Sequence, residues 1–240
     1  MMVRFLAIPM TMHTEDDPPD LHIQQTLIRL LSWLSPSFPT GAFAYSHGLE
    51  NAVQAGLVSE SDELHHWIRI LLRNGSGWND AVIFSEASRL AHQRLDLTEL
   101  AGLAEAMAGS AERHMETMAQ GRAFLVAAEA WPESETNQFP AQCPLPVGVG
   151  AVAGRHGIPI DMGLTAFLHG FSNNLVQAAL RLMPLGQQAG VEIMHALETD
   201  ILAVSQRAAR SSLDDLGSAA IVSEVASLRH ETQTSRIFRS

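Results

Sequence analysis

Hydrophobic residues recur at intervals of three and four along most of this chain, which is the period of an amphipathic helix. The clearest periodic positions, in chain order, are Ile23, Leu27, Leu30, Leu31 and Leu34; Leu64, Trp67, Ile68, Leu71 and Leu72; Leu164, Phe167, Leu168, Phe171, Leu175, Ala178 and Leu182; Gly190, Met194, Leu197, Ile201, Val204 and Ala208; and Ala219, Val222, Val225 and Leu228. Alanine-rich helices are expected over residues 78–91 and 97–130, the second with a break near Gly109 or Gly121. Alternating strand patterns and internal repeats are missing from the sequence. The pattern therefore predicts an all-α, single-domain bundle of roughly eight to ten helices.

Capping and breaking residues set the expected limits of these helices. Asp20 is a suitable N-cap for the first helix, and Ser61 opens the next, which Asn74-Gly75 ends. Residues 133–146 are rich in proline and polar side chains and are expected to form the longest loop. The chain is thus divided into a flexible N-terminal arm, residues 1–19, an all-α domain, residues 20–231, and a C-terminal tail, residues 232–240.

The connector after the first predicted helix has an unusual composition. Residues 35–50 read Ser-Pro-Ser-Phe-Pro-Thr-Gly-Ala-Phe-Ala-Tyr-Ser-His-Gly-Leu-Glu. Pro36 and Pro39 disfavour helix at the residues before them, and Gly41 permits positive φ. The aromatic residues either fill a helix corner or belong to a recognition loop on a rigid scaffold. On the second interpretation, the polar residues that come close together are Tyr45, Ser46, His47 and Glu50.

Composition excludes several classes of function. The net charge of −11 leaves no basic surface for nucleic acid or for an anionic membrane. All fifteen basic residues are arginine, so a Walker A phosphate loop and Schiff-base chemistry, which need lysine, are ruled out. A single cysteine, Cys143, excludes an internal disulfide and fits a reducing cytoplasm. Apolar runs long enough for a membrane helix are not found, and the apolar residues 1–12 lack a signal-peptide cleavage site.

Two patterns suggest cofactor chemistry. The run Gly148 to Ala153 fits the dinucleotide pattern G-x-G-x-x-A, but neither a preceding strand nor a following acid supports it, and small residues there would let helices approach closely. Two Glu-x-x-His pairs, Glu63/His66 and Glu192/His195, have the spacing of a di-iron carboxylate site, which would also need inward glutamates such as Glu50 and Glu116. A di-iron enzyme in a helical bundle is therefore the alternative function.

Loose nickel binding by other histidines is a weaker possibility. The candidates are His13, His65, His66 and His156. Adjacent histidines on a helix point about 100° apart and cannot chelate one ion together. Ser46 and His47 have no nucleophile elbow around them. We assign no catalytic residue and no metal ligand.

Residues 35–50 resemble the signature of the urease accessory protein F (UreF) family, Ser-Pro-x-Phe-Pro-x-Gly-x-Phe-x-Tyr-Ser-His-Gly-Leu-Glu, at every fixed position. Residues 172–187, which run from Ser-Asn-Asn-Leu-Val to Arg-Leu-Met-Pro-Leu-Gly-Gln, are similar to that family's late motif. Residues 236–240, Arg-Ile-Phe-Arg-Ser, are similar to its usual ending. The three blocks occur in the family's order and span most of the chain.

The resemblance implies a non-enzymatic assembly factor for nickel urease. Such a factor forms a homodimer, binds the accessory protein UreD (also called UreH) and through it recruits the GTPase UreG. The assembly then delivers nickel to the urease apoprotein, so no cofactor is expected to be tightly bound to this chain and nickel is handled by the complex. The lysine-free sequence agrees, because nucleotide chemistry must then lie in a partner.

Two groups of residues are the expected contact sites. We expect the connector to present a surface for UreG, or for the path of the metal toward it, through Tyr45, Ser46, His47 and Glu50. We expect the tail to be flexible in the free chain and to become ordered against UreD, through Arg236, Ile237, Phe238 and Arg239. Docking of the tail onto its own bundle is the open alternative.

Overall fold

A computed structural model describes residues 19–239, with side-chain surroundings from residue 21 onward. Within this range the chain forms ten α-helices and no strand: α1 (Pro19–Trp33), α2 (Leu49–Gln54), α3 (Ser61–Asn74), α4 (Ser76–His92), α5 (Thr98–Ala106), α6 (Ala111–Ala128), α7 (Leu145–Arg155), α8 (Ile160–Leu182), α9 (Gln187–Ala208) and α10 (Ile221–His230). Short 3-10 helices occupy Ala42–Ala44, Pro132–Ser134, Thr136–Gln138 and Leu213–Asp215. The predicted all-α bundle is confirmed. The predicted arm lies outside the described residues except for residue 19, which begins α1.

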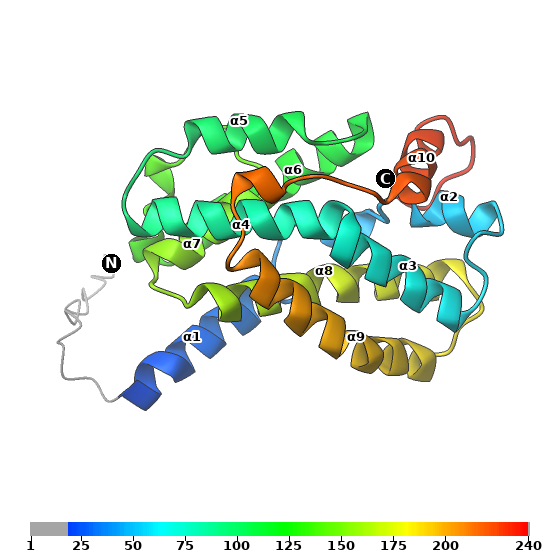
Figure 1. The fold of residues 1–240 in the computed structure, drawn as a ribbon, viewed down its shortest axis with the longest axis horizontal. Helices are drawn as coiled ribbons and strands as arrows, with labels where there is room; N and C mark the ends of the chain where they lie inside the picture. The colour runs from blue at the N-terminus through cyan, green and yellow to red at the C-terminus, as the bar shows by residue number, and fades with distance from the viewer. Residues whose placement is uncertain (1–18, 240) are drawn as a thin grey trace, which may run out of the picture.

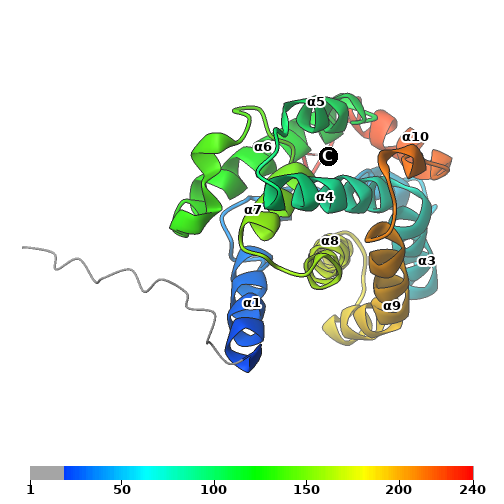
Figure 2. The same ribbon diagram turned by 60° about the vertical axis from the view of Figure 1, so that its left-hand side comes forward.

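The helices lie in three layers (Figures 1 and 2). α5 and α6 form one outer layer, α4 and α7 the middle layer, and α1, α8 and α9 the other outer layer. α8 lies between α1 and α9, and it also contacts α2, α3, α4 and α7. The short helices α2 and α10 pack against each other beside the C-terminus.

Small residues allow the middle layer to pack closely. A Cβ atom at Gly150 of α7 would collide with the carbonyl oxygen of Phe84 in α4, and one at Gly154 would collide with that of Ser88. The glycine-rich run that fits a dinucleotide pattern therefore lies within a buried helix, as its small residues indicate. Helix–helix contact is a sufficient reason for its composition.

Several predicted boundaries agree with the structure. α3 begins and ends where Ser61 and Asn74 indicate, and all five of its periodic apolar residues are buried. The predicted 97–130 helix breaks between α5 and α6, where the Ser110 hydroxyl accepts a hydrogen bond from the Arg113 backbone nitrogen at 3.2 Å. Gly121 does not break α6, because it lies inside the helix directly against the Cys143 carbonyl.

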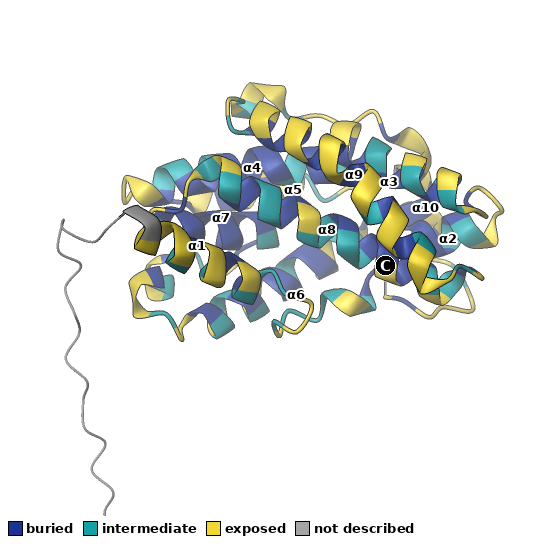
Figure 3. Ribbon diagram, turned by 90° about the horizontal axis from the view of Figure 1, so that it is seen from below, coloured by how far each residue is buried: buried dark blue, intermediate teal, exposed yellow. Residues whose placement is uncertain are grey.

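Two predicted apolar faces are wrong. In α1, Leu27 and Leu31 are 50% and 64% exposed, because the buried side of the helix is the one that carries Thr26, Leu30 and Trp33. Figure 3 shows exposed residues along α1. In α10 the predicted stripe of Val222, Val225 and Leu228 is exposed. The buried side of α10 instead carries small and polar residues, namely Ser223, Ala226, Ser227 and His230.

Candidate functional site

The connector between α1 and α2 is shaped by two glycines in the left-handed region. Gly41 has φ of +74° and opens the 3-10 turn Ala42–Ala44. Gly48 has φ of +75° and begins α2, and a Cβ atom there would lie 2.6 Å from the Ser227 backbone nitrogen of α10. Only glycine satisfies both the conformation and the close approach. The connector is therefore held directly against α10.

The four connector residues that we expected at the surface are buried. Tyr45, Ser46, His47 and Glu50 are each 7% exposed or less. Their burial agrees with the interpretation in which the connector fills a helix corner, and their part in binding UreG or in the path of the metal stays a prediction. They lie among α6, α8 and α10: the His47 side chain contacts Glu116 and Phe171, and Gly48 lies against Ser227. Phe43 is the exposed aromatic residue of the connector, at 67%.

His47 joins a buried ionic cluster, here called the inner cluster, made of His47, Asp80, Arg113 and Glu116. His47 Nε2 lies 2.9 Å from Glu116 Oε1, and Arg113 Nη1 donates to Glu116 Oε2 at 2.7 Å. Arg113 Nη2 also lies 3.5 Å from Asp80 Oδ2. The His47 ring packs edge-on against Phe171 of α8, with ring centroids 5.0 Å apart. The inner cluster thus ties the connector to α4, α6 and α8.

Opposing effects set the pKa values of the acidic groups in the inner cluster. Burial disfavours the ionised form of Glu116, but Arg113 and His47 outweigh it and lower the pKa of this carboxyl to about 2. Burial raises the pKa of Asp80, and the Arg113 guanidinium offsets this only in part. Glu116 is thus the carboxylate that Arg113 holds most firmly.

Two cavities meet at the inner cluster. The larger, about 450 Å³, lies between the connector, α6 and α8, and the smaller, about 210 Å³, lies toward α5 and α10. His47, Asp80, Arg113 and Thr117 line both cavities. Among the described residues, His47 Nδ1 has no hydrogen-bond partner.

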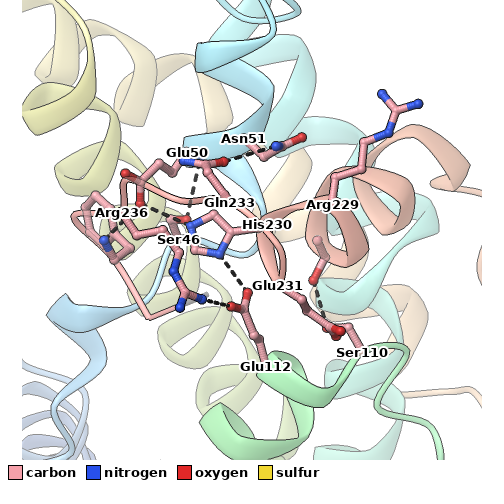
Figure 4. Close-up of polar contacts among 12 residues, drawn as sticks. Ser46, Glu50, Asn51, Ser110, Glu112, Arg229, His230, Glu231, Gln233 and Arg236 are labelled. Carbon is pink, nitrogen blue, oxygen red and sulfur yellow. Dashed lines mark hydrogen bonds and ion pairs between the residues drawn. The ribbon is translucent and has the colours of Figure 1, made fainter.

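A second cluster connects the connector with the C-terminal tail (Figure 4). It consists of Glu50, Glu112, His230 and Arg236, and is here called the tail cluster. The fully buried His230 ring lies between two carboxylates, with Nδ1 2.7 Å from Glu112 Oε2 and Nε2 3.1 Å from Glu50 Oε2. Arg236 Nη1 donates to the other oxygen of Glu112 at 2.7 Å. Figure 4 shows the chain of contacts running from α2 through α10 to α6.

The tail lies on the bundle in this structure, which corresponds to the open alternative and not to the expected free tail. The backbone nitrogens of Ile237 and Phe238 donate to Glu50 at 2.7 and 2.8 Å. The Phe238 ring is 3% exposed, and the Arg181 guanidinium lies 4.1 Å from its centroid. The Arg239 backbone nitrogen donates to the Ala44 carbonyl at 2.8 Å. Ile237 remains 67% exposed.

Residues 172–187 also contact the connector and the C-terminal tail. The Arg181 side chain of α8 donates to the Phe43 carbonyl as well as covering Phe238. The Asn174 amide donates to the Tyr45 carbonyl at 3.4 Å. The connector, the late block and the tail, which are far apart in the sequence, therefore meet at one place in the fold.

The residues proposed for metal binding do not come together. Glu63 accepts two hydrogen bonds from Ser59 at the start of α3, and His66 is exposed. Glu192 and His195 are exposed on α9. Glu50 and Glu116 are buried in the two separate clusters, so the di-iron arrangement is contradicted.

The other histidine candidates do not form a site either. His156 is buried against the Ser134 hydroxyl at 3.0 Å, where burial and the nearby Arg29 lower its pKa to about 4. His13 lies outside the described residues. Within residues 19–239, no group of three or more His, Cys, Asp or Glu side chains is arranged to hold a metal ion.

Sequence comparison decides the family. The profile of the UreF family matches residues 58–198. This chain belongs to the UreF family. It is 54% identical over 214 residues to the urease accessory protein UreF of Mesorhizobium japonicum, covering 89% of this chain and 96% of the relative. It is 53% identical to that of Brucella ovis, covering 89% and 94%, and 51% identical over 216 residues to that of Rhizobium etli, covering 90% and 97%.

These matches confirm the resemblance read from residues 35–50, 172–187 and 236–240, and they support an accessory protein and not an enzyme. In the described part of the chain, no helix is long and apolar enough to cross a membrane. Sequence reasoning missed Glu112 and His230. The available signal was the row of small and polar residues at positions 223, 226, 227 and 230 of α10, which has helical spacing.

Proposed function

We propose that this chain is a non-enzymatic assembly factor that acts with UreD and the GTPase UreG to deliver nickel to the urease apoprotein. The observation that carries this proposal is the junction of the three family-like blocks at one place in the fold. The lysine-free sequence assigns GTP hydrolysis to a partner. We propose no resident cofactor, and a cytoplasmic location.

The residues expected to bind partners take a revised role. The outer surface of the connector is supported from inside by four buried residues, Tyr45, Ser46, His47 and Glu50. The exposed Phe43 is the connector side chain that we propose contacts UreG. The proposed UreD contact consists of the tail residues Arg236, Ile237, Phe238 and Arg239, with Ile237 as its exposed apolar anchor. A single exposed aromatic or aliphatic anchor can contribute much of the energy of an interface.

We also propose a homodimer. The face of α1 directed away from the bundle carries four apolar side chains that are 50–64% exposed, namely Ile23, Leu27, Ile28 and Leu31. Contiguous exposed apolar surface of this kind is typical of a protein interface. A second copy of the chain would bury it.

Reconstitution tests the proposed contacts. The chain is purified with UreD, UreG and apo-urease, and complex formation and nickel-dependent urease activation are measured. Phe43→Ala should weaken UreG recruitment and Ile237→Ala should weaken UreD binding, each with an almost unchanged melting temperature. The matched control is Val191→Ala, because Val191 is 63% exposed on α9. Normal assembly by both variants would refute the assigned surfaces.

The absence of enzymatic activity is tested on the chain alone. Purified without UreG, it should not turn over GTP and should not retain nickel through dialysis. GTP hydrolysis by such a preparation, or tight nickel binding that one histidine substitution abolishes, would contradict the proposed division of labour.

A further inference from the structure

The larger cavity, about 450 Å³, has an aromatic floor and an open mouth. It extends from α6 in one outer layer of helices to α8 in the other (Figure 2). Its floor includes the rings of Trp33, Phe124 and Phe167, which are 5% exposed or less. Its mouth includes Phe43 and Gln177, which are exposed. The volume lies within the range of about 300–1,000 Å³ that is typical of ligand sites, so a large side chain can enter it.

A buried acceptor belongs to the floor of this cavity. Gln120 of α6 lines the cavity and is 4% exposed. Its Nε2 donates to Glu116 Oε1 at 2.9 Å, which assigns the orientation of the amide. The Gln120 carbonyl oxygen is then an acceptor, and within the described residues it receives no hydrogen bond. A buried acceptor without a donor is costly, so the floor favours an occupant that carries an O–H or N–H group.

The charged groups beside Gln120 are engaged with one another. Glu116 is approached by three donors, His47, Arg113 and Gln120. Arg113 also contacts Asp80. A buried charge is costly unless it is paired, and neither Glu116 nor Arg113 is free to pair with a charged occupant. The tip of the occupant is therefore polar and uncharged.

Two carboxamides of α8 lie toward the mouth. Asn173 and Gln177 both line the cavity, and neither side chain forms a hydrogen bond within the described part of the chain. They are four positions apart, about 6 Å along the helix, which is close to the spacing of about 6.7 Å between alternate residues of an extended chain. A carboxamide both donates and accepts, so it can pair with a peptide unit. An extended segment leaves its N–H and C=O groups free for such pairs, whereas a helix pairs them internally.

We infer that this cavity is a docking site for a partner protein, which inserts one tyrosine side chain from an extended segment. The ring packs on the aromatic floor, and the hydroxyl donates to the Gln120 carbonyl oxygen and accepts from the Arg113 guanidinium that lines the same cavity. An indole N–H can only donate, so tryptophan matches the floor less completely. Tyrosine is a frequent interface anchor because it combines a large apolar ring with a polar tip.

The occupant is a different protein and not a second copy of this chain. The sequence contains one tyrosine, Tyr45, which is 4% exposed within the connector. Residues 1–18 contain no tyrosine. Neither a neighbouring copy nor the chain's own first residues can therefore supply the anchor.

NMR titration of the full chain with N-acetyl-tyrosinamide tests this inference without any partner. The indole N–H signal of Trp33, in the floor, should shift. The signal of Trp78, whose Nε1 donates to the Asp215 carbonyl at 2.8 Å outside the cavity, should stay. N-acetyl-phenylalaninamide, which lacks only the hydroxyl, should bind about tenfold more weakly. Equal affinity for the two compounds, tighter binding of N-acetyl-lysinamide, or an unchanged Trp33 signal would overturn the inference.

Two variants assign the contacts. Gln120→Met keeps the length of the side chain and removes the acceptor, so the preference for the tyrosine compound over the phenylalanine compound should vanish. A preference that persists would overturn the role of Gln120. Asn173→Ala should weaken binding of N-acetyl-tyrosinamide severalfold and leave that of p-cresol, which has no peptide unit, unchanged. Gln206→Ala, at an exposed amide on α9, is the matched control and should bind both compounds as the parent chain does.

The p-cresol titration also separates a peptide site from a site for small phenols. If p-cresol binds the parent chain as tightly as N-acetyl-tyrosinamide, Asn173 and Gln177 hold no main chain and the inserted segment is refuted. If Gln120→Met does not fold, the comparison of the two amino-acid amides in the parent chain and the Asn173→Ala result still decide the question. None of these results depends on the proposed nickel-delivery function.

Discussion

Glu50 and Ile237 are separated by 187 positions in the sequence, yet Glu50 Oε1 accepts a hydrogen bond from the Ile237 backbone nitrogen at 2.7 Å. The other oxygen of Glu50 accepts from Phe238 at 2.8 Å and faces His230 at 3.1 Å. One buried carboxylate therefore fixes α2, α10 and the tail relative to one another. A substitution at Glu50 is therefore expected to loosen the C-terminal tail as well as the connector.

Glu50→Ala should destabilise the chain by about 2–4 kcal/mol, because it leaves the His230 ring and two backbone N–H groups without their acceptor. Urea denaturation measures the loss, and amide exchange should show the tail released. Glu198→Ala is the matched control, since that carboxylate is 66% exposed and makes only a 3.5 Å contact with His195. Equal stability of the two variants would show that Glu50 does not hold the junction.

The long helices could be predicted because burial dominates their composition. In α3 and α8 the apolar period coincides with the buried side, since each lies against several neighbours. In α1 and α10 the same period identifies the exposed side. An apolar stripe indicates that one face of a helix will be buried, but it does not say whether another helix of the same chain or a partner protein buries it. The packing of the other helices decides between the two.

The candidate site was predicted only in part, for a related reason. The composition of residues 35–50 identified the connector, but its glycine turns direct Tyr45 and His47 inward instead of toward solvent. Glu112 and His230 are 118 positions apart and belong to no local motif. Their pairing depends on how α10 packs beside α6, which residue spacing does not encode.

Gly48→Ala should destabilise the chain more than Gly56→Ala. Both glycines have positive φ, +75° and +71°, so both substitutions carry a conformational cost of about 1 kcal/mol. Only at Gly48 does the added methyl group meet another element, 2.6 Å from the Ser227 backbone nitrogen, whereas Gly56 faces open space. Thermal and urea unfolding of both variants isolate the contact between α2 and α10. Equal losses would mean that α10 can move aside freely.

Leu31→Arg should prevent the proposed homodimer and leave the fold intact, because Leu31 is 64% exposed on the apolar face of α1. Light scattering across a concentration series measures the mass, and circular dichroism measures the helix content. Val191→Arg, a substitution of equal chemistry on α9, should remain dimeric. A Leu31→Arg variant that is still dimeric would place the interface elsewhere.

Glu116→Gln should lower stability at neutral pH, with a difference from the parent chain that shrinks in acid. Arg113 and His47 outweigh burial and hold the pKa of Glu116 at about 2, below its ordinary value of 4.5. A group whose pKa is lower in the folded state stabilises the fold fully above its unfolded pKa, and this stabilisation is lost as the pH falls through the folded pKa. The difference between the two chains should therefore decline between pH 4.5 and about 2.

Urea denaturation at a series of pH values measures this difference directly. Glu198→Gln, at an exposed site, controls for the loss of one negative charge from an acidic chain. Burial raises the pKa of Asp80 in the same cluster, and the neighbouring Glu116 raises it further, so Glu116→Gln also relieves Asp80 and the measured difference is the net of the two effects. A difference between Glu116→Gln and the parent chain that stays constant down to pH 2 would show that Arg113 and His47 do not hold Glu116 in its ionised form.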